Sequence, residues 1–263
     1  MIHIYKLVLI LYFFNFLIGQ DCNNKSELKL WGTCYSIHNT VKLNLSGIGL
    51  TGEIPESIGG LINLYSLDLS NNRLTGEIPR DIGKLENLKF LYLQDNNLSG
   101  EIPAEIGDLL NLNRLFLASN NLSGEIPADI GNLKDLEYLH LFKNNLSGEI
   151  PDQIGELINL FKLDLSLNQL SGDIPYQLGA LTKLNSLRLF SNQLTGEIFL
   201  GIENLSELEF LFLQDNQLIG QFPFQVCNQR DLNINIKNNG FCSPYPICIS
   251  KNDIDSQNPQ GCP

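Results

Sequence analysis

The sequence lacks the features that nucleic-acid and metal chemistry require. Its 263 residues hold 17 Lys and Arg against 29 Asp and Glu, a formal net charge of −12 at pH 7, and no run of basic residues. A protein that binds phosphate backbones needs a basic surface, so nucleic acid is an unsuitable partner and a cationic or neutral one is favoured. Histidine is limited to 3 residues, and there is neither a glycine-rich phosphate loop nor a Cys-x-x-Cys pair. We therefore expect no cofactor and no bound metal.

Long hydrophobic runs are also scarce, and the one at the N-terminus is short. Residues 1–19 carry a cation at Lys6, then an apolar run from Leu7 that is interrupted only by Asn15. This pattern is typical of a secretory signal peptide. The alternative is an uncleaved membrane anchor, but the run is shorter than the ~20 residues that a spanning helix needs. Because the C-terminal tail is polar, we expect a secreted chain that is not inserted in a membrane.

Six cysteines remain after residue 19, an even number that favours three disulfides in a secreted protein: Cys22, Cys34, Cys227, Cys242, Cys248 and Cys262. Two precede the regular part of the chain and four follow it. Local pairing joins Cys22 to Cys34. The other four allow three connectivities, of which we favour Cys227 with Cys242 and Cys248 with Cys262. A zinc site is the alternative, but the spacings are unlike those of zinc ligands.

A 24-residue repeat occupies the region between these cysteines. A glycine recurs at positions 52, 76, 100, 124, 148, 172, 196 and 220, and a Leu-x-Leu pair begins at 43, 67, 91, 115, 139, 163, 187 and 211. The alternation turns both leucines of each pair to one buried face of a short strand. An asparagine follows at 72, 96, 120, 144, 168, 192, 216 and 239. We expect its amide to point inward and bond the unpaired backbone of each bend.

Each repeat predicts one coil of a solenoid. In the coil at residues 88–111, Gly100 permits a tight backbone, Pro103 fixes an extended φ, and Ile106 supplies an apolar contact on the returning side. Eight full coils are expected over residues 40–231, and Ile234 and Ile236 mark a shorter ninth.

The consensus LxxLxLxxNxLSGEIPxxIGxLxN resembles the plant-type leucine-rich repeat of polygalacturonase-inhibiting proteins and receptor-kinase ectodomains. The resemblance implies an α/β solenoid: a right-handed superhelix with a parallel concave β-sheet, 3₁₀ or extended convex segments, and disulfide-stapled caps. The expected division is a signal peptide (1–19), an N-terminal cap (20–39), eight repeats (40–231), and a partial ninth repeat with a C-terminal cap (232–263). The segment WGTC at 31–34 is similar to the end of the family's N-terminal cap, but most of the usual helical cap is missing.

Parallel strands about 4.8 Å apart align equivalent outward positions into columns across the concave face. These columns are rich in aromatic and cationic residues, which are enriched in the cores of protein interfaces. The alternative is that aromatic residues simply favour strands and shield the leucines beneath. The candidate ligand-binding residues are Phe90, Tyr92, Arg114, Phe116, Tyr138, His140, Phe142, Phe161, Lys162, Asp164, Arg188 and Phe190.

No catalytic site is expected. His140 and Asp164 are column neighbours with Ser166 and Ser186 nearby, but an open sheet offers neither an oxyanion hole nor a water-excluded pocket. The same pair supplies only two metal ligands, one fewer than a catalytic zinc site needs.

Two further patterns lie outside the concave columns. A carboxylate column runs through Glu53, Glu77, Glu101, Glu125, Glu149, Asp173 and Glu197. It could dock a basic partner or calcium, but we favour a solvated rim that aids solubility. Sequons for N-linked glycans predict modification at Asn24, Asn97, Asn121, Asn145 and Asn204. The sequon at Asn44 lies in the first strand, and we do not expect it to be used.

The resemblance implies extracellular recognition of a protein, peptide or polysaccharide partner by the concave face. Examples in the family are inhibition of a cell-wall-degrading enzyme and a role in signalling or defence. The alternative is a structural, adhesive or surface-adsorbing solenoid, ice-binding proteins included. Adsorption to a lattice favours small uniform columns, whereas the concave columns are irregular.

Overall fold

The computed structural model describes residues 22–23, 25–199, 201–228, 232–259 and 262. The expected signal peptide at 1–19 and the sequon at Asn24 lie outside these residues. Within them, no helix is both long and apolar enough to cross a membrane.

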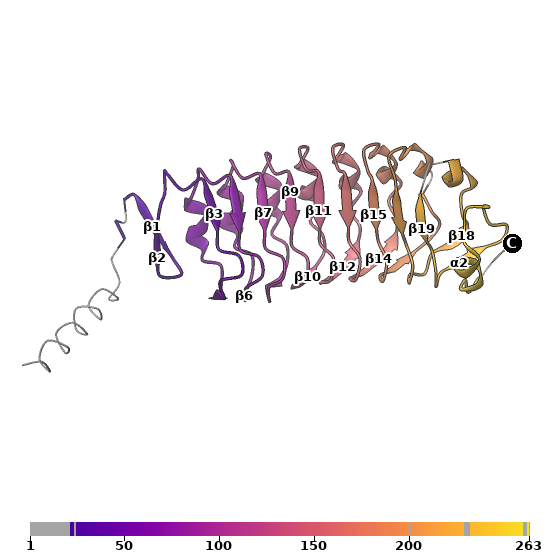
Figure 1. The fold of residues 1–263 in the computed structure, drawn as a ribbon, viewed down its shortest axis with the longest axis horizontal. Helices are drawn as coiled ribbons and strands as arrows, with labels where there is room; N and C mark the ends of the chain where they lie inside the picture. The colour runs from indigo at the N-terminus through magenta and orange to yellow at the C-terminus, as the bar shows by residue number, and fades with distance from the viewer. Residues whose placement is uncertain (1–21, 24, 200, 229–231, 260–261, 263) are drawn as a thin grey trace, which may run out of the picture.

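The described chain forms an elongated solenoid whose strands lie side by side along its length (Figure 1). Its main sheet has nine parallel strands in chain order. They are β3 Lys42–Asn44, β5 Ser66–Asp68, β7 Phe90–Tyr92, β9 Arg114–Phe116, β11 Tyr138–His140, β13 Lys162–Asp164, β15 Ser186–Arg188, β17 Phe210–Phe212 and β19 Asn233–Asn235. Neighbours pair at the repeat spacing, as Leu91 with Leu115 and Leu115 with Leu139. The main sheet thus holds one strand for each predicted repeat, including the shorter ninth.

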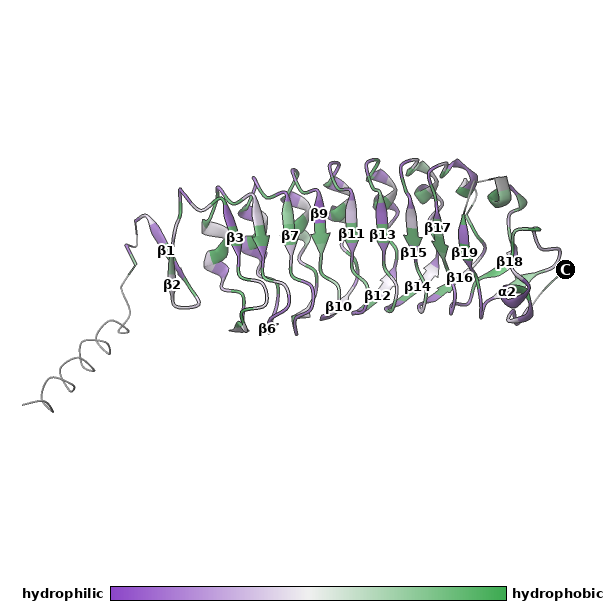
Figure 2. Ribbon diagram, viewed as in Figure 1, coloured by the Kyte–Doolittle hydropathy of each residue, from purple (hydrophilic) through white to green (hydrophobic). Residues whose placement is uncertain are grey.

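The core is a continuous stack of leucine and isoleucine inside the coils. Leu91, Leu93, Leu98, Ile106 and Leu109 are fully buried, as are their equivalents in the other central coils. Figure 2 shows hydrophobic segments recurring in every coil along the stack. Because each coil packs mainly on its two neighbours, the fold is stabilised coil by coil.

The inward asparagine ladder is confirmed. In the fourth coil, Asn120 Oδ1 accepts a hydrogen bond from the Leu98 amide at 3.0 Å. Its Nδ2 donates to the carbonyls of Leu93 and Leu117, both at 3.0 Å. The ladder continues to Asn239, which bonds the Leu218 amide in the same way. The side-chain amide of each ladder asparagine thus satisfies backbone groups that the pairing of the strands leaves without a partner.

The convex side carries one 3₁₀ helix per coil. These are η1 Glu56–Gly60, η2 Arg80–Lys84, η3 Ala104–Asp108, η4 Ala128–Asn132, η5 Asp152–Glu156, η6 Tyr176–Ala180, η7 Ile202–Asn204 and η8 Phe224–Asn228. A proline with extended ψ precedes each of η1 to η6. Its fixed φ suits the start of a helix, and its missing donor costs nothing there.

The extended segments between the asparagine ladder and the 3₁₀ helices pair into a second parallel sheet. Its strands are β8 Ser99–Gly100, β10 Asn121–Gly124, β12 Asn145–Glu149, β14 Gln169–Asp173 and β16 Gln193–Thr195. A separate pair joins β4 Thr51–Gly52 to β6 Arg73–Leu74. The glycine of this segment has φ between +72° and +80° in the coils from Gly52 to Gly220, which explains its recurrence. We call β8 to β16 the side sheet.

The N-terminal cap is an antiparallel hairpin of β1 Glu27–Leu30 and β2 Thr33–Ser36. Cys22 and Cys34 form a disulfide, as predicted. Leu30 is fully buried against the first coil, and Leu28 packs against the same core. The hairpin therefore closes the open end of the core that the missing helical cap would otherwise cover.

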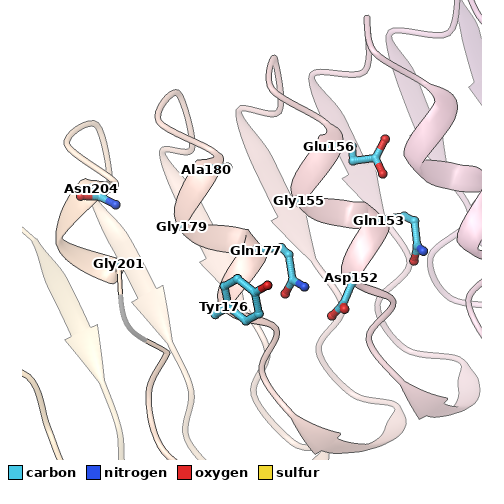
Figure 3. Close-up of a pocket in the computed structure, with 10 residues that line it drawn as sticks. All are labelled: Asp152, Gln153, Gly155, Glu156, Tyr176, Gln177, Gly179, Ala180, Gly201 and Asn204. Atoms are coloured by element: carbon cyan, nitrogen blue, oxygen red, sulfur yellow. The ribbon is translucent and has the colours of Figure 1, made fainter.

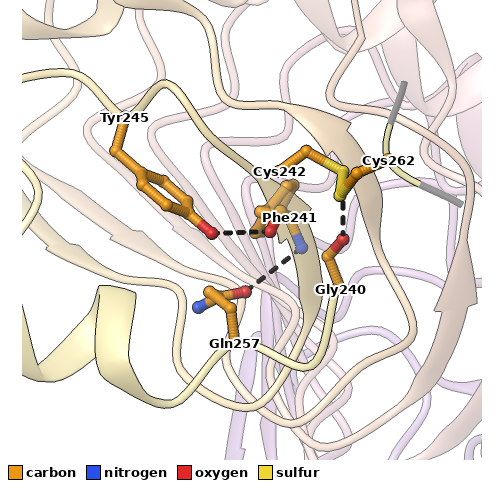
Figure 4. The surroundings of a disulfide bond; sticks show 6 residues. All are labelled: Gly240, Phe241, Cys242, Tyr245, Gln257 and Cys262. Atoms are coloured by element: carbon orange, nitrogen blue, oxygen red, sulfur yellow. Dashed lines mark hydrogen bonds between the residues drawn. A yellow bond between two sulfur atoms is a disulfide. The ribbon is translucent and has the colours of Figure 1, made fainter. Parts of the chain in front are cut away.

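The C-terminal cap contains β18 Ile219–Gln221 paired with β20 Gly240–Cys242, and the helix α2 Lys251–Asp255. The favoured disulfide pairing was wrong: the bonds join Cys227 to Cys248 and Cys242 to Cys262. Cys242 is held in β20 beside β18, whereas Cys227 lies in η8 on the helical side of the coil. Figure 4 shows the returning tail held at β20, where Tyr245 Oη donates to the Phe241 carbonyl at 2.7 Å.

Candidate functional site

The concave sheet brings most of the predicted binding residues together. One column reads Phe90, Arg114, Tyr138 and Lys162, because these residues are aligned in β7, β9, β11 and β13. The next reads Tyr92, Phe116, His140 and Asp164 in the same strands. Between these two columns lie leucines that point inward, so both columns face outward on the same side of the sheet.

The aromatic side chains of these columns contact one another in an unbroken line. Centroid distances are 5.2 Å for Tyr65–Phe90 and for Tyr92–Phe116, 6.3 Å for Phe90–Tyr92, 6.5 Å for Phe116–Tyr138 and 5.9 Å for Tyr138–Phe161. His140 lies parallel to Phe116 at 4.3 Å and 6.3 Å from Phe142. We call this set the aromatic patch: Tyr65, Phe90, Tyr92, Phe116, Tyr138, His140, Phe142 and Phe161.

Arg114 lies within the aromatic patch between two of its rings. Its guanidinium carbon is 5.5 Å from the Phe90 ring centroid and 4.9 Å from that of Tyr138, which is cation–π distance. Arg114 Nε is a buried atom without a hydrogen-bond partner, and so is Gln94 Oε1, two residues after Tyr92. Lys162 lies over Phe161 at 5.8 Å. The patch therefore combines large apolar area with a fixed positive charge and unused polar atoms.

A charged cluster adjoins the patch. Asp164 is 9% exposed, its Oδ1 accepts a hydrogen bond from the Ser166 hydroxyl at 2.5 Å, and its Oδ2 is 3.9 Å from Arg188. Burial lowers the pKa of His140 below its usual value; Asp164 opposes this shift, whereas Lys162 and Arg188 add to it. The Ser166 hydroxyl is directed to the carboxylate and not to the imidazole, so these residues are not arranged as a Ser-His-Asp triad.

Two residues differ from the expected grouping. Phe190 makes no ring contact with the aromatic patch in the described structure, because the small, buried Ser166 stands between it and Phe142 in their column. Tyr65 joins the patch although the sequence did not single it out. It belongs to a fourth column, one residue before each strand, which also supplies Phe161. Tyr65 could have been found from the sequence by including the column that lies one residue before each strand.

The family assignment rests on repeat matches along the chain. Models described as leucine-rich repeat match residues 38–98, 111–133, 135–157 and 159–181. These matches cover the coils that carry the aromatic patch, and the nine-strand sheet continues the same period on both sides. The chain belongs to the leucine-rich-repeat family.

Solved leucine-rich-repeat structures from plants are similar to this chain. The plant peptide hormone receptor RGFR1 in complex with RGF2 has 40% identity and a TM-score of 0.72, over 73% of this chain and 31% of the receptor chain. The Arabidopsis receptor kinase HAESA, in complex with the peptide hormone IDA and the co-receptor SERK1, has 36% identity and a TM-score of 0.74, over 76% and 34%. A plant ice-binding protein has 28% identity and a TM-score of 0.59, over 83% and 77%.

This leucine-rich-repeat chain thus spans about a third of the length of the two receptor chains and most of the ice-binding protein. Comparison with curated proteins gives no match. The three disulfides and the similarity to receptor ectodomains identify an extracellular type of leucine-rich-repeat domain.

The carboxylate column has a packing role in the leucine-rich repeat. The Glu101 Cγ lies 2.8 Å from the position that a Cβ on Gly124 would take, and the other members of the column cover the next glycine in the same manner. Among the described residues, no group of three or more His, Cys, Asp or Glu is arranged to hold a metal ion. Each carboxylate side chain of the column therefore packs against the glycine of the next coil.

Four of the predicted glycosylation sites are exposed. Asn97, Asn121 and Asn145 lie along the side sheet or directly before it, and Asn204 ends η7. Their amides are therefore free of the inward ladder that the preceding asparagines form.

Proposed function

We propose that this domain is a secreted, non-enzymatic recognition protein that binds an extracellular protein or peptide through the aromatic patch and Arg114. The supporting observation is the continuous line of ring contacts from Tyr65 to Phe161, with the guanidinium between Phe90 and Tyr138. Rings held by each other lose little rotamer freedom on binding, so the area they bury contributes efficiently to affinity.

The uneven surface of the patch favours a protein or peptide partner over a flat polysaccharide. Most of its ring pairs meet edge to face, with interplanar angles of 66° for Tyr92–Phe116 and 76° for Phe116–Tyr138. Such a surface is corrugated and suits side chains of different sizes, whereas a planar sugar chain stacks on coplanar rings. The two receptor structures similar to this chain were solved with peptide hormones, which supports the same class of partner.

The test compares two matched double variants of the secreted domain. Phe116→Ala with Tyr138→Ala removes the centre of the patch, whereas Phe210→Ala with Phe212→Ala removes aromatic residues from the same two columns outside it. Partners are captured from extracellular medium, identified, purified and titrated. We expect the first variant to lose about 2 kcal/mol or more, roughly 30-fold in Kd. The second should bind within about threefold of the unchanged domain.

All four side chains are partly exposed, so both variants should stay folded, with Tm lowered by only ~2–4 °C per kcal/mol lost. Equal affinity of the unchanged domain and the Phe116/Tyr138 variant would disprove the proposed site.

A second candidate function, adsorption to an ordered surface, is favoured by the side sheet. Its hydroxyl column is uniform, unlike the concave columns, and consists of Ser99, Ser123, Ser147, Ser171 and Thr195. The plant ice-binding protein matches this chain over most of both lengths. A repeating column on parallel strands offers the regular spacing that a lattice requires.

Inhibition of ice recrystallisation tests this candidate. The unchanged domain should inhibit, Ser123→Tyr with Ser147→Tyr should abolish the effect by breaking the flat column, and Phe116→Ala with Tyr138→Ala should leave it intact. No inhibition by the unchanged domain would remove ice binding from consideration.

A further inference from the structure

The convex side has an open groove that crosses η5, η6 and η7 (Figure 3). It measures about 610 Å³, a volume within the usual range for small-ligand sites. Asn204 and Gly201 line one end, and Tyr176, Gln177, Gln153 and Asp152 line the rest. None of these residues belongs to the concave site.

The repeat changes at Gly201, which lines this groove. In five earlier coils this position carries a side chain whose Cβ packs close to the glycine of the preceding 3₁₀ helix. Examples are Gln153 over Gly131 and Gln177 over Gly155, with Cβ atoms 2.6 and 2.5 Å from where a glycine Cβ would lie. At the next step the neighbour of Gly179 is Gly201, which has no side chain, and its carbonyl oxygen stands 3.1 Å from that point. A slot is therefore left between η6 and η7.

Asn204 lies directly at this slot. Its Nδ2 is 3.2 Å from the position that a Cβ on Gly201 would take, so its amide nitrogen borders the space that the missing side chain vacates. The side chain is exposed, and the sequence Asn204-Leu205-Ser206 is a sequon for N-linked glycosylation. A sugar attached to this nitrogen would begin inside the groove.

The rest of the groove has the chemistry of a carbohydrate site. Tyr176 is 71% exposed, so its ring is free to pack against the C–H face of a sugar. Gln177 lines the groove and its buried Oε1 has no hydrogen-bond partner, so rotation of this side chain toward the groove would offer an acceptor to a sugar hydroxyl or N-acetyl group. Figure 3 shows Gln177 and Tyr176 adjacent in η6, beside the coil that carries Gly201 and Asn204.

We propose that Asn204 is glycosylated and that the first sugars of its glycan occupy the η6–η7 groove against Tyr176. In the attachment step, the Asn204 amide nitrogen loses a proton and bonds to the anomeric carbon of an oligosaccharide. The bond from that carbon to its lipid diphosphate carrier breaks, and the carrier leaves as the diphosphate. The glycan then covers Gly201 and Gly179, and its sugars make the packing contacts that the missing side chain at Gly201 would have made.

The test uses the full chain secreted from a glycosylating host. Peptide mapping measures occupancy at Asn204 and at Asn121, which is the control because it lies exposed on the side sheet. A peptide N-glycosidase is then applied to the folded protein. We expect release from Asn204 to be about tenfold slower than from Asn121, which corresponds to ~1.4 kcal/mol of protection. Unfolding the protein should make the two rates equal.

A second variant removes a contact in the groove but keeps the sequon at Asn204. Tyr176→Ala removes an exposed ring and should leave the fold intact, yet raise the release rate at Asn204 to that at Asn121. The proposal is overturned if Asn204 is unoccupied while Asn121 is modified, if both glycans are released equally from the folded chain, or if Tyr176→Ala leaves the protection unchanged. None of these outcomes depends on the concave partner.

Discussion

Replacement of Asn120 by leucine tests what holds the coils together. The two side chains have the same number of heavy atoms, branched at the same carbon, so the change removes hydrogen bonds without leaving a cavity. Asn120 is 8% exposed in the centre of the solenoid. Its Oδ1 is the partner of the Leu98 amide, and its Nδ2 serves the carbonyls of Leu93 and Leu117.

The expected loss of stability depends on which of these backbone groups keep another hydrogen-bond partner. The Leu93 carbonyl also accepts from Asn96, and the Leu117 carbonyl also accepts from Asn144, both at 3.1 Å. Each carbonyl therefore keeps one bond, and the loss of the other costs about 0.5–1.5 kcal/mol. The Leu98 amide is left without a partner in a buried site, which costs about 1–3 kcal/mol. Asn120→Leu should thus destabilise the domain by about 2–6 kcal/mol, out of the ~5–15 kcal/mol typical of a domain.

Urea unfolding followed by circular dichroism measures this change, provided that the slope with denaturant is unaltered. The control is Asn121→Leu at the next position, where the side chain is exposed and the change should stay within about 0.5 kcal/mol. Asn120→Asp separates hydrogen bonding from shape. Its carboxylate would face two carbonyls and destabilise the fold at neutral pH. On acidification it takes up a proton and can donate again, so part of the stability should return. A stability of Asn120→Leu equal to that of Asn121→Leu would refute the reasoning.

Three further changes probe other parts of the molecule. Gly124→Ala should lower the free energy of unfolding in urea by about 1–2 kcal/mol. At this position φ is +76°, and the new methyl would lie 2.8 Å from the Glu101 side chain of the previous coil. Replacing Cys242 and Cys262 by serine opens a loop of 20 residues and should cost about 3 kcal/mol, measured as a lower Tm, while non-reducing peptide mapping of the unchanged chain should recover this bond. The pKa of His140 is lowered in the folded chain, so its contribution to stability is complete above the unfolded pKa of ~6.5 and is lost as the pH falls below it. His140→Gln should flatten the dependence of Tm on pH in that window.

The coil could be predicted from the sequence because the residues that determine it act locally and recur in every repeat. The alternation at Leu91 and Leu93, the amide at Asn96 and the proline at Pro103 each act on the same coil or its neighbour. In a solenoid those contacts make up nearly the whole fold. Eight copies of the same pattern fix the register, since a slip of one residue would turn the leucines to solvent.

The caps could not be predicted in the same way, because they occur once and depend on contacts distant in sequence. The choice between Cys242 and Cys248 as the partner of Cys227 depends on the pairing of β18 with β20 and on the route of the chain through α2. No periodicity encodes that route. The side sheet was missed for a related reason: its short segments look irregular in one coil and become strands only when neighbouring coils stack.

The candidate site lies between these two cases. The positions that face outward follow from the alternation, so the columns through Phe90, Arg114 and Tyr138 could be written down from the sequence. Whether those side chains touch depends on their rotamers and on the sizes of their neighbours, which the alternation leaves open. Ser166 separates Phe190 from the patch, and Tyr65 extends it from a column that precedes the strand. The leucines and asparagines that build a coil are nearly invariant along the solenoid, so under the proposed function the outward residues determine the choice of partner. Exchanging the outward residues of β9 and β11 between two such proteins should therefore transfer binding without loss of the fold.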